Sequence, residues 1–291
     1  MPWTAIVNPT AGKGRTRRLL PDLERALIAA GVDVDVRVSG GPDEPPRLAK
    51  EAAARGHDLL AVGGDGLVSV VAAVAADERR RLAIVPSGSG NDFARELGHD
   101  VKRSLDAVRA LEVGVDRSVD LGRVNGRWFT TVTATGFDAE ANRWANTVTR
   151  LSGTALYVAA VARTLARYRP RRFALTIDDR EVEIDAWLVA TGNGPAYGGG
   201  MRVTPDARLD DGVLHVTVVG PVSRLEFMKT FPRVFRGTHV THPMIETFRA
   251  SSVRVQVVGE EMDAYADGER VGPLPARIDA APGALTVRAP R

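Results

Sequence analysis

The 291-residue sequence contains no cysteine, which excludes disulfide bonds, thiolate metal sites and cysteine nucleophiles. Aromatic residues make up only 5% of the chain, too few to favour a surface on which nucleic-acid bases stack. No apolar run approaches the roughly 20 residues that a membrane-spanning helix needs. Residues 1–4 lead directly into a strand-like segment, so no secretory signal is expected. We therefore expect a cytoplasmic protein that binds no nucleic acid and meets a membrane only peripherally, at its inner face.

Charged residues make up 26% of the chain and hydrophobic residues 44%, proportions typical of a globular protein with one large or two modest domains. The formal net charge is only +3, but arginines cluster within residues 15–18, 79–81 and 167–172. Such clusters are either ordinary solvated surface or sites that attract phosphates and anionic lipid head groups. The sequence leaves both interpretations open.

The first 120 residues or so alternate strand and helix patterns. Apolar strands are predicted at residues 5–7, 58–62 and 82–85, and residues 32–38 alternate valine with polar residues, as in a half-exposed strand. Helical patterns lie between them, the first with Thr16 as its cap and Gly31 as its stop. This alternation predicts a three-layer α/β domain with a mostly parallel sheet, in which ligands bind at the carboxyl ends of the strands.

The pattern changes near Val119, where Asn125-Gly126 between two strand-like runs predicts a hairpin. The remainder is mainly antiparallel strand pattern, with helices predicted at residues 151–168 and 225–234. We therefore predict an α/β domain of residues 1–118 and a β-rich, sandwich-like domain of residues 119–279. Whether residues 280–291 return to the first domain is left open.

Three predicted strands of the first domain end in glycine-rich turns, at residues 8–14, 63–66 and 86–92. Glycine lets the backbone approach a ligand closely, and successive N–H groups followed by a helix N-terminus attract anions. One such turn is commonplace, but three at one sheet edge predict a polyphosphate cradle. Two of the turns carry an aspartate, Asp65 and Asp92, and Mg²⁺ is usually bound through one or two carboxylates together with substrate phosphates.

Other nucleotide-binding motifs are absent from the sequence. It has no G-x-x-x-x-G-K-[ST] and no glycine fingerprint opening a helix after the first strand, which excludes an ordinary P-loop protein and argues against a dinucleotide-dependent dehydrogenase. It also lacks H-R-D and D-F-G, which excludes a protein kinase.

The ordered set of motifs resembles the diacylglycerol kinase catalytic-domain family, which includes bacterial lipid kinases and sphingosine kinases. The resemblance rests on Gly-Gly-Asp-Gly at residues 63–66 and Pro-Ser-Gly-Ser-Gly-Asn-Asp-Phe-Ala-Arg at residues 86–95. Weaker matches, in the family's order, are residues 8–14, 136–139, 197–200, 205–207, 210–214 and 267–269. The matches cover nearly the whole chain and imply an ATP-dependent kinase of a lipid hydroxyl, with ATP and Mg²⁺ in a cleft between the two domains.

The resemblance also implies roles for individual residues. Glu269 is the expected general base, and Asp65 and Asp92 are expected to hold the Mg²⁺ of the nucleotide. The Asp-Asp-Gly turn is expected to hold a structural Mg²⁺ through the Asp211 side chain and the carbonyls of Arg208 and Val213. The nucleotide is expected to contact Asn8, Pro9, Gly12, Ser39, Gly63, Gly64, Asp65, Gly66, Ser87, Gly88, Ser89, Asn91 and Asp92.

Several alternatives stay open at this point. A kinase of NAD uses the same Gly-Gly-Asp-Gly turn, although the residues after Ser89 and the terminal Asp-Gly-Glu fit the lipid kinases better. Leu67 stands where the family has threonine, which favours a non-catalytic binding protein. The apolar helix at residues 151–168, with Arg150, Arg163, Arg167 and Arg169 beside it, is either core or a surface that docks on anionic lipid. The lipid acceptor, diacylglycerol or a relative, is not identified, and a homodimer is neither indicated nor excluded.

Substitution of Glu269 by glutamine tests the expected base. Because the amide keeps the shape of the carboxylate but cannot accept a proton, Glu269→Gln should bind ATP as the wild type does and lose phosphoryl transfer. Equilibrium ATP binding and transfer of labelled phosphate measure the two properties separately. Normal turnover by the variant would remove Glu269 from the mechanism.

Overall fold

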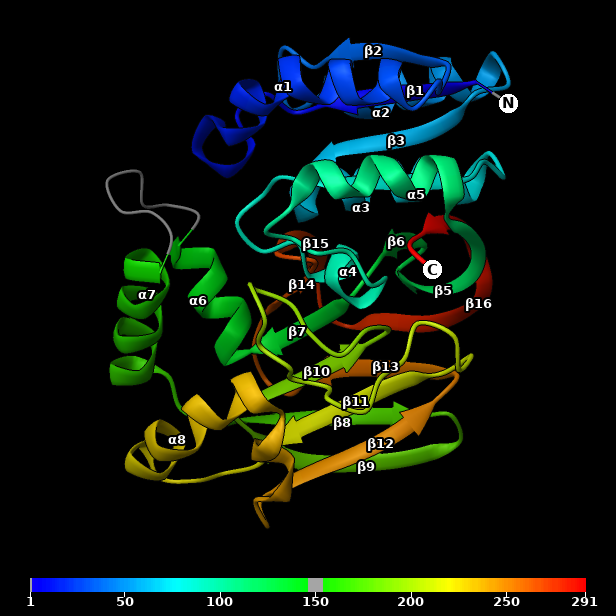
Figure 1. The fold of residues 1–291 in the computed structure, drawn as a ribbon. Coiled ribbons are helices and arrows are strands. Elements are labelled where there is room, and N and C mark those ends of the chain that lie inside the picture. Colours follow the sequence, from blue (N-terminus) through cyan, green and yellow to red (C-terminus); the bar gives the residue numbers. More distant parts are fainter. Residues whose placement is uncertain (1, 146–153) are drawn as a thin grey trace. The chain divides into compact units, whose positions relative to one another are not determined.

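The computed structural model describes residues 2–145 and 154–291 (Figure 1). The chain divides into two compact units, one of Met1–Leu121 with Pro282–Arg291 and one of Gly122–Ala281. Among the described residues, no helix combines the length and apolarity that crossing a membrane would require.

The first unit is built on parallel strands in the order β2-β1-β3-β4. Strand β3 and strand β4 are buried along their whole length, as expected of parallel strands covered on both faces. The last residues of β16 (Ala276–Ala289) extend the sheet, with Val287 paired in parallel to Leu82. The strand bounds are β1 (Trp3–Val7), β2 (Val34–Val38), β3 (Asp58–Gly63) and β4 (Leu82–Pro86).

Helices cover both faces of this sheet. Trp3, Ala5 and Val7 of β1 share a core with Leu23 of α1 and Leu111 of α5, while α2 and α3 contact each other and the strands. This arrangement confirms the predicted three-layer α/β domain. The helices are α1 (Ala11–Ala29), α2 (Glu44–Ala54), α3 (Asp65–Asp77), α4 (Asp92–Glu96) and α5 (Ala107–Val113), with a short η1 (Ser104–Asp106).

The second unit is formed mainly by antiparallel strands, as the sequence predicts. One sheet has the order β12-β11-β10-β7-β14-β15, and β13 pairs with β16 and with β8, which pairs with β9. The Asn125-Gly126 turn joins β5 to β6, with φ of 48° and 82°. Strand β5 (Val115–Val124) begins in the first unit and ends in the second. The other strands are β6 (Arg127–Phe129), β7 (Val132–Gly136), β8 (Arg171–Ile177), β9 (Arg180–Ala186), β10 (Leu188–Gly192), β11 (Leu214–Val219), β12 (Ile245–Ala250), β13 (Ser252–Val257), β14 (Asp263–Ala266) and β15 (Glu269–Pro273).

Helices of the second unit differ in detail from the prediction. The helix predicted at residues 151–168 is described as α7 (Thr154–Arg167), and Arg150 and the side chains of Leu156, Val158 and Ala159 lie outside the described residues. The predicted helix at residues 225–234 ends early, as α8 (Arg224–Thr230), and continues as η2 (Phe231–Arg236). Pro232 explains the change, because it has no N–H with which to continue an α-helix. The other helices are α6 (Phe137–Ala145) and η3 (Thr238–Thr241).

Aromatic side chains from distant segments form the core of the second unit. Phe227 of α8 lies 4.8 Å from both Phe137 and Trp187, measured between ring centroids. Phe227, Phe231 and Phe235 follow one another at a spacing of four residues. Phe227 is buried, whereas Phe235 is half exposed. The aromatic series is therefore core at one end and surface at the other.

Candidate functional site

The three glycine-rich turns of the first unit touch one another through their backbones. A β-carbon on Gly88 would lie 2.3 Å from the Cα of Gly64, and one on Gly12 would lie 2.3 Å from the carbonyl oxygen of Ser87. Such contacts exclude any side chain at Gly12 and Gly88 unless the backbone moves. The glycines therefore serve first to let the turns pack together at the carboxyl ends of β1, β3 and β4.

Two polar contacts hold the third turn in shape. The amide of Asn91 accepts the N–H of Gly88 at 2.9 Å and donates to the carbonyl of the same residue at 3.0 Å. The hydroxyls of Thr16 and Ser87 are 2.6 Å apart in the interior. Thr16, expected from the sequence to cap a helix, therefore connects α1 to the third turn.

The carboxylate of Asp65 connects the second turn to the third. Its two oxygens accept the N–H groups of Asn91 at 2.5 Å and Asp92 at 2.6 Å. Because a carboxylate oxygen can accept more than one bond, these contacts are compatible with a cation bound to Asp65. Asp92 is buried and pairs with Arg95 at 2.6 Å.

The start of α3 lies at the glycine turn where the sequence predicts an anion site. Val68 is the first residue of α3 whose N–H is bonded back to the turn, at 3.0 Å from the carbonyl of Gly64. The N–H groups of the residues before it have no acceptor one helical turn back. Gly66, in this first turn, is exposed and has open space where a side chain would be. Anions are stabilised at such a helix N-terminus.

Leu67 faces away from this site. Its side chain is buried, and its Cδ2 atom would lie 2.7 Å from a β-carbon placed on Gly63. Leucine at this position therefore packs under the turn. Leu67 therefore does not supply the hydroxyl that the threonine of the family pattern would have here.

The other predicted nucleotide contacts lie at the ends of β1, β2 and β4. The side-chain oxygen of Asn8 accepts the N–H and the hydroxyl of Thr10, at 3.0 and 2.8 Å, which shapes the turn around Pro9. The hydroxyl of Ser39 donates to the carbonyl of Gly41 at 2.7 Å. Ser89 is exposed.

Asp120 was missed by the sequence analysis. Its carboxylate is buried and accepts the N–H of Gly283 at 2.7 Å, which holds β5 beside β16 within the first unit. An acidic residue between Val119 and Leu121, both apolar, is the signal that could have identified it.

In the second unit, the two carboxylates of the acidic triplet at residues 267–269 have different surroundings. Asp267 accepts five hydrogen bonds, from the N–H groups and hydroxyls of Thr130 and Thr131 at 2.7–2.9 Å and from the N–H of Val132 at 3.3 Å. Asp267 and Gly268 have positive φ and form the turn between β14 and β15. Glu269 begins β15 with its side chain exposed. Asp267 therefore anchors the turn, and Glu269 is the carboxylate left accessible.

The second unit also contains a largely apolar cavity with a buried carboxyl group. Asp138 lines it from the start of α6, accepts a hydrogen bond from Asn142 at 2.9 Å and is only 5% exposed. Burial raises the pKa of Asp138 to about 6, against weaker lowering by its hydrogen bonds to Tyr197 and Asn142. The sequence analysis placed Asp138 within a family motif but gave it no role. The apolar lining includes Phe137, Leu188, Val203, Val219, Phe227 and Phe231.

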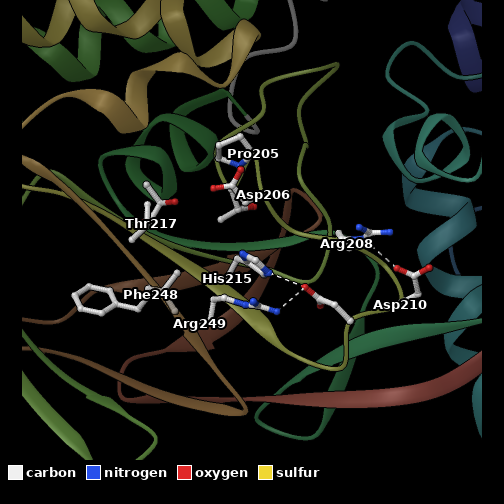
Figure 2. Close-up of a pocket in the computed structure, with 12 residues that line it drawn as sticks. Pro205, Asp206, Arg208, Asp210, His215, Thr217, Phe248 and Arg249 are labelled. Carbon is white, nitrogen blue, oxygen red and sulfur yellow. Dashed lines mark hydrogen bonds and ion pairs between the residues drawn. The ribbon is translucent and has the colours of Figure 1, made fainter.

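The turn before β11 lies at a second, polar hollow, shown in Figure 2. One oxygen of Asp211 lies 2.9 Å from Nε2 of His215 and 3.3 Å from a guanidinium nitrogen of Arg249. Its other oxygen is 3.4 Å from the N–H of Val213. Arg208 lies 3.5 Å from Asp210. The residues predicted to hold a structural metal are thus part of a cluster of ion pairs.

Comparison with known proteins gives consistent results over both units. The model of the diacylglycerol kinase catalytic domain matches residues 2–124, and that of the YegS C-terminal NAD kinase beta sandwich-like domain matches residues 131–289. A diacylglycerol kinase of Mycobacterium tuberculosis is 39% identical over 295 residues, covering 99% of this chain and 95% of the relative. One of Bacillus subtilis is 30% identical over 276 residues, covering 93% and 90%.

Solved structures share the fold. The crystal structure of a diacylglycerol kinase from Bacillus anthracis str. Sterne superposes with a TM-score of 0.77 at 24% identity, and the match covers 99% of this chain and 96% of that one. At this identity the likeness extends to the fold alone.

Replacement of Gly88 by alanine tests the packing of the turns. The added methyl would overlap the backbone of Gly64, so Gly88→Ala should lower the free energy of unfolding by about 1–3 kcal/mol. Gly41→Ala is the matched control, because nothing lies within 4 Å of its added carbon. Thermal and urea unfolding of both variants measure the effect, and equal stability of the two would contradict the close contact.

The raised pKa of Asp138 predicts a pH dependence of stability. Its protonated form is favoured in the folded state, so its contribution is fully present below about pH 4 and is lost as pH rises through about 6. The loss is on the order of 2–3 kcal/mol. Asp138→Asn stays neutral, so the variant should gain stability relative to the wild type between pH 4 and 7. Urea unfolding at several pH values, followed by tryptophan fluorescence, measures the difference. If the free energy of unfolding changed with pH in the same way for both proteins, Asp138 would be ruled out as the source of the pH dependence.

Proposed function

The chain belongs to the diacylglycerol kinase catalytic-domain family, and on this premise we propose that it is an ATP-dependent lipid kinase. It transfers the γ-phosphate of ATP to a hydroxyl group of diacylglycerol or a related lipid. The observation that carries the proposal is the cavity of the second unit, which is lined mainly by aromatic and aliphatic side chains. Because such a lining offers few partners to polar groups, it suits a small apolar group, such as the end of an acyl chain, better than a nucleotide.

The first unit supplies the nucleotide side of the reaction. The N-terminus of α3, with Gly64 and Gly66, receives phosphate oxygens, and the turns that include Asn8, Gly12 and Ser89 surround them. Asp65 would hold Mg²⁺, which when bound neutralises charge on the phosphates. We assign Asp92 to positioning, because its carboxylate is buried against Arg95.

Glu269 accepts the proton of the acceptor hydroxyl. That oxygen forms a bond to the γ-phosphorus while the bond from phosphorus to the β,γ-bridging oxygen breaks, and ADP leaves. Support for Glu269 comes from its exposure at the start of β15 and from the five hydrogen bonds through which Asp267 fixes the preceding turn. A fixed turn keeps the base in one place while the acceptor binds.

A nucleotide- or lipid-binding protein without catalysis is the second candidate. It is favoured by Leu67, whose buried side chain gives the phosphate site no hydroxyl. A kinase of NAD is a third, and the apolar cavity argues against it, because the ribose and amide groups of NAD need polar partners.

Transfer of label from γ-labelled ATP with Mg²⁺ tests these functions against one another. The acceptors are diacylglycerol, sphingoid bases, phosphatidylglycerol, a total lipid extract and NAD, each presented with either phosphatidylglycerol or phosphatidylcholine vesicles. A labelled lipid is the expected product, and faster transfer with the anionic vesicles would support peripheral membrane contact through the arginines of α7. Label on NAD, or ATP binding without any product, would overturn the proposal in favour of the other candidates.

Filling the apolar cavity tests its role as the acyl site. Val222 lines the cavity and is half-buried, so Val222→Phe should raise KM for a long-chain diacylglycerol severalfold and spare a short-chain one. The KM for ATP should stay unchanged. Val258→Phe makes the same exchange at an exposed position and serves as control. Equal effects on long and short chains would place the acyl group elsewhere.

A further inference from the structure

The turn at residues 210–213 precedes β11 and carries two adjacent aspartates. The family resemblance implies a structural Mg²⁺ here, held by the Asp211 side chain and the carbonyls of Arg208 and Val213. The Asp211 side chain is only 14% exposed, so its negative charge needs a partner within the protein. The question is which positive group provides it.

The pairing of β11 with β12 provides one. His215 and Arg249 are direct partners in the antiparallel register, so their side chains lie on the same face of the sheet. Both reach the same oxygen of Asp211, His215 at 2.9 Å and Arg249 at 3.3 Å (Figure 2). The neighbouring carboxylate, Asp210, has an arginine of its own, Arg208, at 3.5 Å. Each aspartate of the turn thus has its own guanidinium.

These residues do not fit a Mg²⁺ ion. Magnesium requires oxygen ligands at about 2.0–2.1 Å in octahedral geometry. Oδ2 of Asp211 already receives N–H groups from His215 and Arg249. The guanidinium of Arg249 cannot lose its proton. A divalent ion bound to Asp211 would therefore have to displace Arg249 or lie beside a permanent positive charge.

We propose that Arg249, together with the imidazole N–H of His215, takes the place of a structural metal ion at this turn. One guanidinium charge balances one carboxylate, and the turn stays closed without a divalent cation. The fold of the second unit is then independent of Mg²⁺, and a chelator affects only steps that use the nucleotide. This inference concerns stability and stands whether or not the proposed reaction is correct.

Thermal unfolding of the full chain without nucleotide tests the proposal. The melting temperature of the wild type should be the same in excess EDTA and in millimolar MgCl₂. Arg249→Gln should melt about 2–4 °C lower in EDTA, whereas Arg249→Lys, which keeps the charge, should lose less. Arg254→Gln removes an exposed arginine from β13 and is the matched control, expected to leave the melting temperature unchanged.

Two results would overturn the proposal. One is a rise of several degrees in the wild-type melting temperature on addition of MgCl₂ that disappears in Asp211→Asn. The other is an Arg249→Gln variant as stable as the wild type in EDTA. Metal analysis of the desalted wild type gives an independent answer even if a variant fails to fold. The expected result is that no divalent ion is present in stoichiometric amount. One retained equivalent of Mg²⁺ would refute the inference.

Discussion

The first unit depends on one close backbone contact, that of Gly88 against Gly64. It brings the turn after β4 onto the turn after β3, and the hydrogen bonds between these two turns follow from it. Asp65 can reach the N–H groups of Asn91 and Asp92 only because the two turns are already in contact. The same approach lets Ser87 and Gly88 share the carbonyl of Gly63, at 2.8 and 3.2 Å. A side chain at either glycine would separate the turns.

Aspartates that accept backbone N–H groups recur as the means of joining distant segments. Asp65 links two turns of the first unit, Asp120 links β5 to β16, and Asp267 holds residues 130–132 beside the β14–β15 turn. A carboxylate can accept up to about four hydrogen bonds and strengthens each through its charge. Acidic residues that resemble catalytic groups in the sequence can therefore be required for folding, and an activity assay alone would not separate the two roles.

The two units contribute chemically different surfaces. The first presents glycine backbone and a helix N-terminus, which suit phosphate oxygens. The second presents an apolar cavity with a protonatable carboxyl at Asp138. Polar phosphate recognition in one unit and apolar recognition in the other is the combination that a kinase with a lipid acceptor needs.

The sequence by itself determined the fold class, the family and the order of the motifs along the chain. Each depends on local patterns: alternation of strands with helices, glycine turns after apolar runs and the Asn125-Gly126 hairpin. Family membership is confirmed by the relatives that cover nearly the whole chain. The individual site residues and the ends of the domains remain predictions. Only the tertiary structure decided how the acidic residues are used. Arg249 and Asp211 are 38 residues apart in the sequence, and the register of β11 and β12 brings them together. The burial of Asp138 follows from helices and strands that pack over it. Such contacts depend on long-range packing, which no local pattern contains.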